Sequence, residues 1–255
     1  MIGNCVRFGL CCIFKEQPIK FRRTTAKYLS QFSVAEQKNR ISNICLANAK
    51  SLMDALIFCH QNNIGDFRIN SQILPLKTHP QVGYDIMDLP EGDAIIKKFK
   101  ACGTFSRKHH IRTTFHPDQF IVLSSLRPDV VKRSIADLEY QAQVSQWVNA
   151  DVINIHAGGV YNDKPSALNR LRKNIDRLSD SVRKRLTLEN DDRSYTPEDL
   201  FPVCKELGIP LVYDIHPHRC LEDRFNIKQA TDLSVETWDR EPLFHISSPI
   251  HGWQT

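Results

Sequence analysis

Four short apolar segments of the 255-residue sequence each end in a histidine or an acidic residue. Segments of this length, rich in β-branched residues and separated by helical patterns, predict the strands of a parallel α/β fold. In a (β/α) barrel the carboxyl ends of all strands meet at one face, which carries the catalytic residues. The segment ends are His116 after 111–115, His156 after 152–155, Glu189 after 186–188 and Asp214 after 211–213.

Further strands are expected at 7–14, 66–69 and 243–248, and helices at 36–62, 92–108, 129–149, 165–182, 198–207 and 226–233. Seven strand–helix units are therefore visible where eight would close a barrel. The prediction is an α/β chain of the TIM (β/α)8 type that lacks its last strand/helix unit. We expect one domain over residues 1–255, C-terminally short, because no linker divides the chain. The helix at 92–108 is expected to break or end near Gly103, and the basic helix at 165–182 to form a solvated outer face.

Composition bounds the protein class without specifying a function. A 41% apolar and 25% charged content is ordinary for a globular domain, and the net charge of +5 permits a polyanionic partner without requiring one. No apolar run reaches the roughly 18 residues of a membrane helix, so no membrane partner is expected. The eight cysteines lack metal-site spacing and are interpreted as reduced core residues of a cytoplasmic protein. The basic segment 15–31 is either a solvated loop or a phosphate-contacting loop.

The chemistry of the strand ends suggests a metal site. Imidazole and carboxylate groups together suit borderline divalent ions such as manganese or zinc. The candidate ligands are too many for one tetrahedral ion, so two or more ions that share carboxylates are expected. Such multi-metal sites serve phosphodiester hydrolysis. The candidates are His79, His116, His156, Glu189, Asp214, His216, His218 and His245.

Several of these residues lie in segments that resemble the UV damage endonucleases, barrel enzymes related to endonuclease IV. The resemblance extends from about residue 6 to 250. It implies manganese-dependent incision of double-stranded DNA immediately 5′ to a pyrimidine photolesion, which leaves a 3′-hydroxyl. No protein partner is inferred. The matching segments are 68–80, 116–120, 154–161, 187–192, 214–216 and 245–249.

The resemblance also implies residue roles. It implies two or three ions, manganese first and zinc as the other candidate. Gln119 and Phe120 match a glutamine–aromatic pair that wedges into the duplex at the lesion, whereas burial of Phe120 in a strand-like run 120–123 is the alternative from the residues alone. The implied ligands are His79, His116, His156, Glu189, Asp214 and His245, with His116, His156, Glu189 and Asp214 also as the catalytic residues.

The sequence departs from the family pattern in four places. Pro217 separates His216 from His218, so either histidine could be the ligand. Leu243 stands where the family has a lysine, and Leu10 and Phe14 replace a tyrosine and an asparagine. The family continues to a further histidine and glutamate ligand that this sequence does not reach, which predicts a truncated product or an incomplete site.

Two other functions use the same features. A sugar isomerase or epimerase also places Glu, Asp and His at barrel strand ends around a divalent ion, because fold alone does not decide function. The third hypothesis is a protein that binds damaged DNA without incising it, because the sequence does not reach the further histidine and glutamate ligands of the family pattern. The glutamine–aromatic pair and the basic loop favour the nuclease, because a sugar enzyme has no use for either.

Overall fold

The computed structural model describes residues 6–247, in which seven strands follow one another in the order β1 to β7. The strand pairs β1–β2, β2–β3, β4–β5, β5–β6 and β6–β7 are all parallel. The predicted α/β class, with parallel strands in chain order, is therefore confirmed. The strands are β1 (Gly9–Leu10), β2 (Asp66–Ile69), β3 (Arg112–Phe115), β4 (Ala150–His156), β5 (Leu186–Glu189), β6 (Leu211–Asp214) and β7 (Phe244–His245).

Several helices begin at a side chain that caps them. Capping boxes, in which the cap and the third helical residue bond each other's backbone, start α2 at Ser33, α7 at Thr196 and α9 at Asn226. The helices are α1 (Ala26–Leu29), α2 (Val34–Gln61), the 3-10 helix η1 (Ile86–Asp88), α3 (Gly92–Lys108), α4 (Pro128–Val148), α5 (Lys164–Ile175), α6 (Asp180–Arg183), α7 (Pro197–Leu207), α8 (Ile215–Cys220) and α9 (Ile227–Glu236).

The chain forms two compact units, each built from segments distant in sequence. The first comprises Met1–His116 and Tyr140–Val152, and the second comprises Pro117–Glu139 and Ile153–Thr255. Strand β4 begins in the first unit and ends in the second. The expectation of a single domain over 1–255 stays a prediction.

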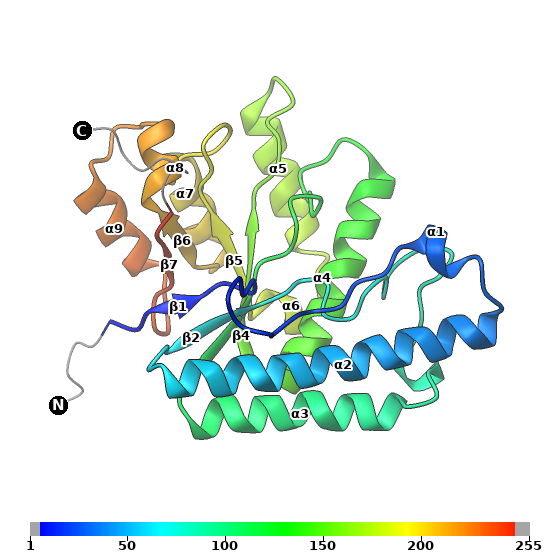
Figure 1. Cartoon of the computed structure of the whole chain (residues 1–255). Helices are drawn as coiled ribbons and strands as arrows, with labels where there is room; N and C mark the ends of the chain where they lie inside the picture. Colours follow the sequence, from blue (N-terminus) through cyan, green and yellow to red (C-terminus); the bar gives the residue numbers. More distant parts are fainter. Residues whose placement is uncertain (1–5, 248–255) are drawn as a thin grey trace. The chain divides into compact units, whose positions relative to one another are not determined.

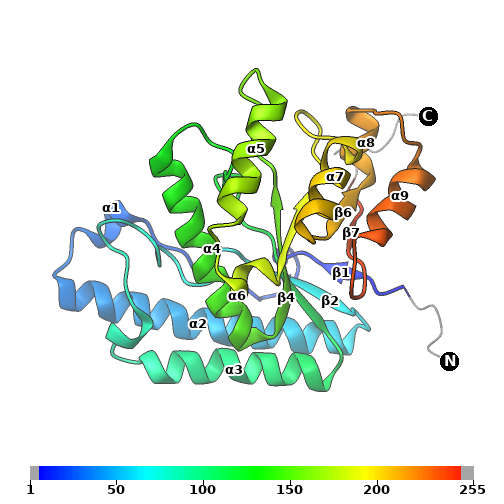
Figure 2. The same cartoon turned by 180° about the vertical axis from the view of Figure 1, so that it is seen from behind.

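In the first unit, α2 and α3 lie side by side, as both views show (Figures 1 and 2). The predicted break of α3 near Gly103 is wrong, because the helix is continuous from Gly92 to Lys108. A Cβ atom at Gly103 would lie only 2.2 Å from the carbonyl oxygen of Trp147. The glycine therefore permits a close approach to the end of α4 and does not interrupt the helix.

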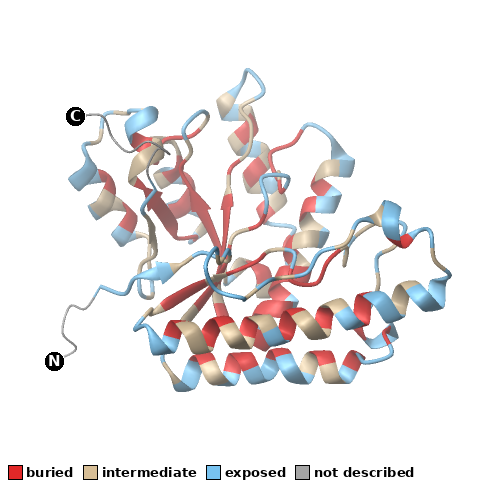
Figure 3. Cartoon of the chain, viewed as in Figure 1, coloured by how far each residue is buried: buried red, intermediate tan, exposed pale blue. Residues whose placement is uncertain are grey.

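In the second unit, strands β5 and β6 are buried along their whole length (Figure 3). The single helix predicted at 165–182 is wrong, because α5 ends at Ile175 and α6 begins at Asp180. The Ser179 side chain accepts from the backbone N–H of Val182 and so starts a new helix.

The first and last strands are shorter than predicted. Residues Phe8 and Ile13, which flank β1, are at least 70% exposed and lie outside the sheet. Ser248, the last residue of the predicted seventh strand, lies outside the described residues, and so does Cys5. None of the helices within 6–247 combines the length and apolar composition of a membrane span.

The interpretation of the cysteines as core residues is only partly correct. All seven described cysteines are free thiols, as expected, but three of them are not buried. The buried thiols are Cys45, Cys59, Cys102 and Cys204, whereas Cys12 is half-buried and Cys11 and Cys220 are exposed.

Candidate metal centre and DNA-contacting loop

Strand register brings the ligand-type residues of the second unit to the same end of its sheet. His156 is the register partner of Glu189 across β4 and β5, and Asp214 is the partner of His245 across β6 and β7. Each of these residues ends its strand. Because the strands are parallel, their carboxyl ends converge, and the four side chains share one edge of the sheet.

Glu189, Asp214 and His245 form one ligand group, in which the candidate ligand atoms all lie within 4.8 Å of one another. The two carboxylate residues are buried, with 3% and 5% of their surface exposed. Nδ1 of His245 lies 2.8 Å from Oε1 of Glu189. Two buried carboxylates this close repel each other, so a cation between them would relieve a substantial electrostatic cost.

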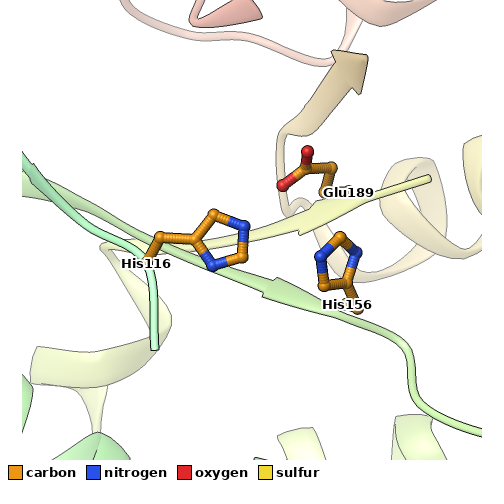
Figure 4. A group of neighbouring side chains, drawn as sticks. All are labelled: His116, His156 and Glu189. Atoms are coloured by element: carbon orange, nitrogen blue, oxygen red, sulfur yellow. The ribbon is translucent and has the colours of Figure 1, made fainter. Parts of the chain in front are cut away.

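Glu189 also belongs to a second group, with His116 and His156, whose ligand atoms meet the same 4.8 Å limit. Figure 4 shows the three side chains turned toward one another. His116 follows directly after β3, and His156 ends β4. Among the described residues, the two groups contain five of the eight predicted ligands, with Glu189 common to both.

Polar side chains orient both carboxylates. The Asn154 amide donates to Oε2 of Glu189 while its oxygen accepts from the hydroxyl of Thr187 at 2.8 Å. The Ser247 hydroxyl lies 3.0 and 2.8 Å from the two carboxylate oxygens of Asp214. None of these orienting residues was among the site residues predicted from the sequence. The available signal was an asparagine and a threonine inside otherwise apolar strands.

Asn190 provides a further support at the base of the site. Its side-chain oxygen accepts from the backbone N–H of Asp214, and its amide donates to the Asp214 carbonyl, both at 2.9 Å. The residue is fully buried. Asn190 therefore ties the end of β5, next to Glu189, to Asp214 at the end of β6.

Of the two histidines that follow Asp214, the geometry favours His216 as the candidate metal ligand. His218 is 5% exposed, with Nδ1 at 2.8 Å from the Tyr213 hydroxyl and Nε2 at 3.0 Å from Oδ1 of Asp223. Both ring nitrogens of His218 are therefore engaged, and the prediction of His218 as a ligand does not fit this geometry. His216 follows Asp214 closely and its backbone N–H donates to Oδ1 of that residue at 3.0 Å.

His79 lies in the first unit, on the connection after β2. Its Nδ1 accepts from the backbone N–H of Gln81 at 3.2 Å and of Val82 at 3.4 Å. Nε2 is therefore the ring atom that could serve as a ligand. Within the described part of the chain, neither His79 nor His216 belongs to the two ligand groups.

Gln119 and Phe120 lie in a turn directly after His116, and both side chains are exposed. Phe120 has 76% of its surface exposed and residues 120–123 form no strand, so the alternative of core packing for Phe120 is wrong, although Ile121 and Leu123 are buried. The neighbouring pocket, with a volume of about 240 Å³, is lined by Gln119 and also by His156, Tyr161 and Arg193. An exposed aromatic ring therefore stands next to a pocket whose lining includes His156, one of the candidate ligands.

Helix α5 holds the loop that contains this turn. Nε of Arg170 donates to the Ser124 carbonyl at 2.8 Å, and the Asn174 amide donates to the Leu123 carbonyl at 2.7 Å. The Ser124 hydroxyl donates to the Ala157 carbonyl at 2.7 Å. The expectation that this basic helix is only a solvated face is therefore wrong for Arg170.

The turn after β4 is fixed by close packing. Gly158 has a φ of +91°, and a Cβ atom there would lie 2.6 Å from the Ser124 hydroxyl oxygen. The Tyr195 hydroxyl donates to the Gly159 carbonyl at 3.3 Å. Burial, and then the Asp191 carboxylate, raises the pKa of Tyr195 to about 12, so the phenol remains a neutral donor.

The donor set fits a divalent metal. It combines imidazole nitrogens with carboxylate oxygens and, in the two groups, contains no thiolate. Borderline ions such as manganese and zinc accept this mixture, and the buried, hydrogen-bonded carboxylates match the supported ligands of metal sites.

Comparisons with known proteins agree on one family. A profile described as UV-endonuclease UvdE matches residues 6–255. A UV DNA damage endonuclease of Bacillus velezensis (strain DSM 23117 / BGSC 10A6 / LMG 26770 / FZB42) is 34% identical over 254 residues, which cover 95% of this chain and 77% of that protein. A UV DNA damage endonuclease of Bacillus pumilus (strain SAFR-032) is 34% identical over 233 residues, covering 89% and 71%.

Solved structures give the same result for the fold. The crystal structure of SacUVDE matches with a TM-score of 0.87 and 29% identity, over 98% of this chain and 83% of that one. D-psicose 3-epimerase from Clostridium cellulolyticum H10 matches with a TM-score of 0.59 and 14% identity, over 95% and 73%, which is a similarity of fold alone. The predicted TIM-type architecture is therefore confirmed.

Proposed function

Because the chain belongs to the UV-endonuclease UvdE family, we propose that it incises double-stranded DNA immediately 5′ to a UV photolesion and leaves a 3′-hydroxyl. The observation that carries the proposal is Glu189, a buried carboxylate at the end of β5 that is common to the two ligand groups. The proposal includes a cytoplasmic location, in keeping with the seven free thiols.

The proposed cofactor is two or three divalent ions, with manganese first and zinc as the alternative. His116, His156, Glu189, Asp214 and His245 would hold them, and His79 and His216 are further candidates. Bound divalent ions supply an activated water and neutralise charge on the phosphate during hydrolysis. The chain's own contribution is to orient the carboxylates through Asn154 and Ser247, which limits their rotation before substrate binds.

Lesion recognition is assigned to the turn that contains Gln119 and Phe120. A damaged base pair is poorly stacked, so separating it costs less than separating an intact pair, and an inserted side chain fills the gap. The exposure of Phe120 supports this role, because an apolar ring kept in water is available for stacking. The pocket lined by His156, Tyr161 and Arg193 lies beside the turn and offers polar groups to a displaced nucleotide.

A nicking assay on irradiated and unirradiated plasmid, with and without manganese, tests the proposal. We expect nicks only in irradiated plasmid and only with metal. The 5′ position of incision and the 3′-hydroxyl are checked on an end-labelled duplex with one photolesion. Elemental analysis should find at least one ion per chain, and its absence together with absence of nicking would refute the proposal.

A Phe120→Ala variant tests the wedge. We expect it to lose most lesion-dependent nicking while keeping its metal. Full nicking by this variant would remove the wedge from the proposal. Binding of irradiated duplex without any incision by the unaltered chain would instead identify a damaged-DNA-binding protein.

A further inference from the structure

The positive charge of the chain is concentrated in one segment. Residues 15–40 contain seven lysines and arginines and two glutamates. The segment therefore has a net charge of +5, which equals that of the whole chain. The remaining residues contain 27 basic and 27 acidic side chains and are balanced. A charge excess confined to a tenth of the chain points to one local polyanion-binding surface.

Buried hydrogen bonds hold the backbone of this segment against α2. Asn48 is fully buried, and its oxygen accepts from the Arg22 backbone N–H at 2.7 Å while its amide donates to the Arg22 carbonyl at 3.0 Å. The Ser51 hydroxyl donates to the Lys20 carbonyl at 2.8 Å. The backbone around Arg22 is thus fixed although its side chain is exposed.

The guanidinium groups of Arg22 and Arg23 are available for a ligand. Neither forms an ion pair or a hydrogen bond with any residue in the described part of the chain, whereas most described arginines elsewhere pair with a carboxylate or a carbonyl, as Arg112 pairs with Asp151. Glu36, the acidic residue closest in sequence to Arg40, is engaged by Ser33 in the cap of α2. Glu36 still interacts electrostatically with Arg40, whereas no carboxylate of the described residues forms an ion pair with Arg22 or Arg23.

A third arginine is held in place by aromatic rings. The Arg40 guanidinium carbon lies 3.7 Å from the centre of the Phe32 ring, and Nη1 donates to the Tyr28 hydroxyl at 3.2 Å. Arg22, Arg23 and Arg40 line an open groove of about 600 Å³ beside α1 and the first turns of α2. Threonine and asparagine side chains that complete its wall are of the kind that contact phosphate oxygens.

We propose that this groove, defined by Arg22, Arg23 and Arg40, binds the phosphate backbone of duplex DNA independently of the lesion. The identity of the partner rests on the proposed function. An arginine guanidinium group can donate two parallel hydrogen bonds to the oxygens of one phosphate. Contacts to the phosphate backbone position a DNA duplex without reading its base sequence. The groove would thus raise affinity for intact and damaged DNA alike.

The test is the salt dependence of binding to an intact duplex without metal, compared between the unaltered chain and an Arg22→Gln/Arg23→Gln variant. Each lost phosphate contact lowers the slope of log affinity against log salt by about 0.9, so the slope should fall by about 1.8. If the two contacts act only through counterion release, affinity at 0.1 M salt should fall roughly 60-fold relative to a 1 M reference. The fall should be the same for irradiated duplex.

The matched control is Lys97→Gln/Lys98→Gln on α3, which removes two exposed charges from the same unit. We expect this variant to keep the original slope, and thermal melts should show that both variants are folded. An unchanged slope in the arginine variant would overturn the proposal, as would an equal loss in the control. The proposal would also be overturned if the arginine variant lost binding to anionic vesicles but kept its full affinity for the duplex.

These outcomes are independent of the proposed incision. A chain that binds intact duplex through Arg22 and Arg23 but never nicks irradiated DNA would refute the proposed function and support the groove. A chain that nicks normally while the arginine variant keeps its salt slope would refute the groove alone.

Discussion

Glu189 combines burial, a hydrogen bond from Asn154, contact with His245 and membership of both ligand groups. Glu189→Gln keeps the shape of the side chain and removes its charge. We expect manganese affinity to fall by more than the roughly 10–100-fold that loss of a supporting residue causes, and lesion-dependent nicking to be lost. Calorimetric titration with manganese measures the affinity.

The control for this substitution is Glu206→Gln, a glutamate on α7 whose partner is Arg172. It removes the same charge from the surface of the same unit and should leave metal affinity unchanged. Equal affinity in Glu189→Gln and the unaltered chain would contradict the assignment of Glu189 as a ligand.

Ser247 is a supporting residue, because its hydroxyl contacts both oxygens of Asp214. We expect Ser247→Ala to lower metal affinity by roughly 10–100-fold, since the carboxylate then rotates more freely. Ser247→Thr keeps the hydroxyl and should restore most of the affinity. If Ala and Thr variants bind manganese equally well, the hydroxyl has no orienting role.

At the scale of elements, α5 positions the loop that contains Gln119 and Phe120. Asn174→Ala removes the amide that binds the buried Leu123 carbonyl, at a cost of about 1–3 kcal/mol for an unsatisfied group. We expect single-turnover nicking of irradiated DNA to fall about tenfold, which corresponds to roughly 1.4 kcal/mol, while manganese affinity is unchanged.

Lys173→Ala is the matched control, because Lys173 is the exposed neighbour of Asn174 on the same helix. This variant should nick at the original rate. Parallel losses of metal affinity and nicking in Asn174→Ala would show a general disruption of the unit and no specific role for the loop anchor.

Local sequence patterns predict some of the helices but not others. The sequence predicts α2, α7 and α9 well, since capping residues and apolar spacing act within a few positions of each other. It fails at α5 and α6, where a continuous helical pattern contains the cap residue Ser179. It also predicts a helix break at Gly103, although this glycine permits close packing against the backbone of Trp147, which is distant in sequence.

For the whole molecule, metal binding is linked to stability. The two buried carboxylates Glu189 and Asp214 repel each other without a cation, so manganese should stabilise the folded chain. At a hundredfold excess over its dissociation constant, one bound ion adds about 2.7 kcal/mol. For a chain of this size that raises Tm by roughly 5–10 °C, as measured by calorimetry.

A chelator should reverse this increase. The Glu189→Gln variant should show little or no increase with manganese, because it lacks the charge common to both groups. An increase of full size in Glu189→Gln would mean that the stabilising ion binds elsewhere on the chain.

The sequence by itself determined the order of the parallel strands. It also determined that a ligand-type residue stands at or directly after the end of β3, β4, β5 and β6. It did so because strand and helix periodicities, and the position of a residue after an apolar run, are local properties. This position predicts the site residues His116, His156, Glu189 and Asp214.

Only the tertiary structure decided which chemically similar residues converge and what orients them. His245 meets Glu189 across 56 positions of sequence, whereas His218 is engaged by Tyr213 and Asp223. No local pattern distinguishes these two histidines, because the difference lies in neighbours brought by strand register and packing. For the same reason the exposure of Phe120 and the anchoring of its loop by α5 follow from contacts between distant segments, which sequence spacing does not encode.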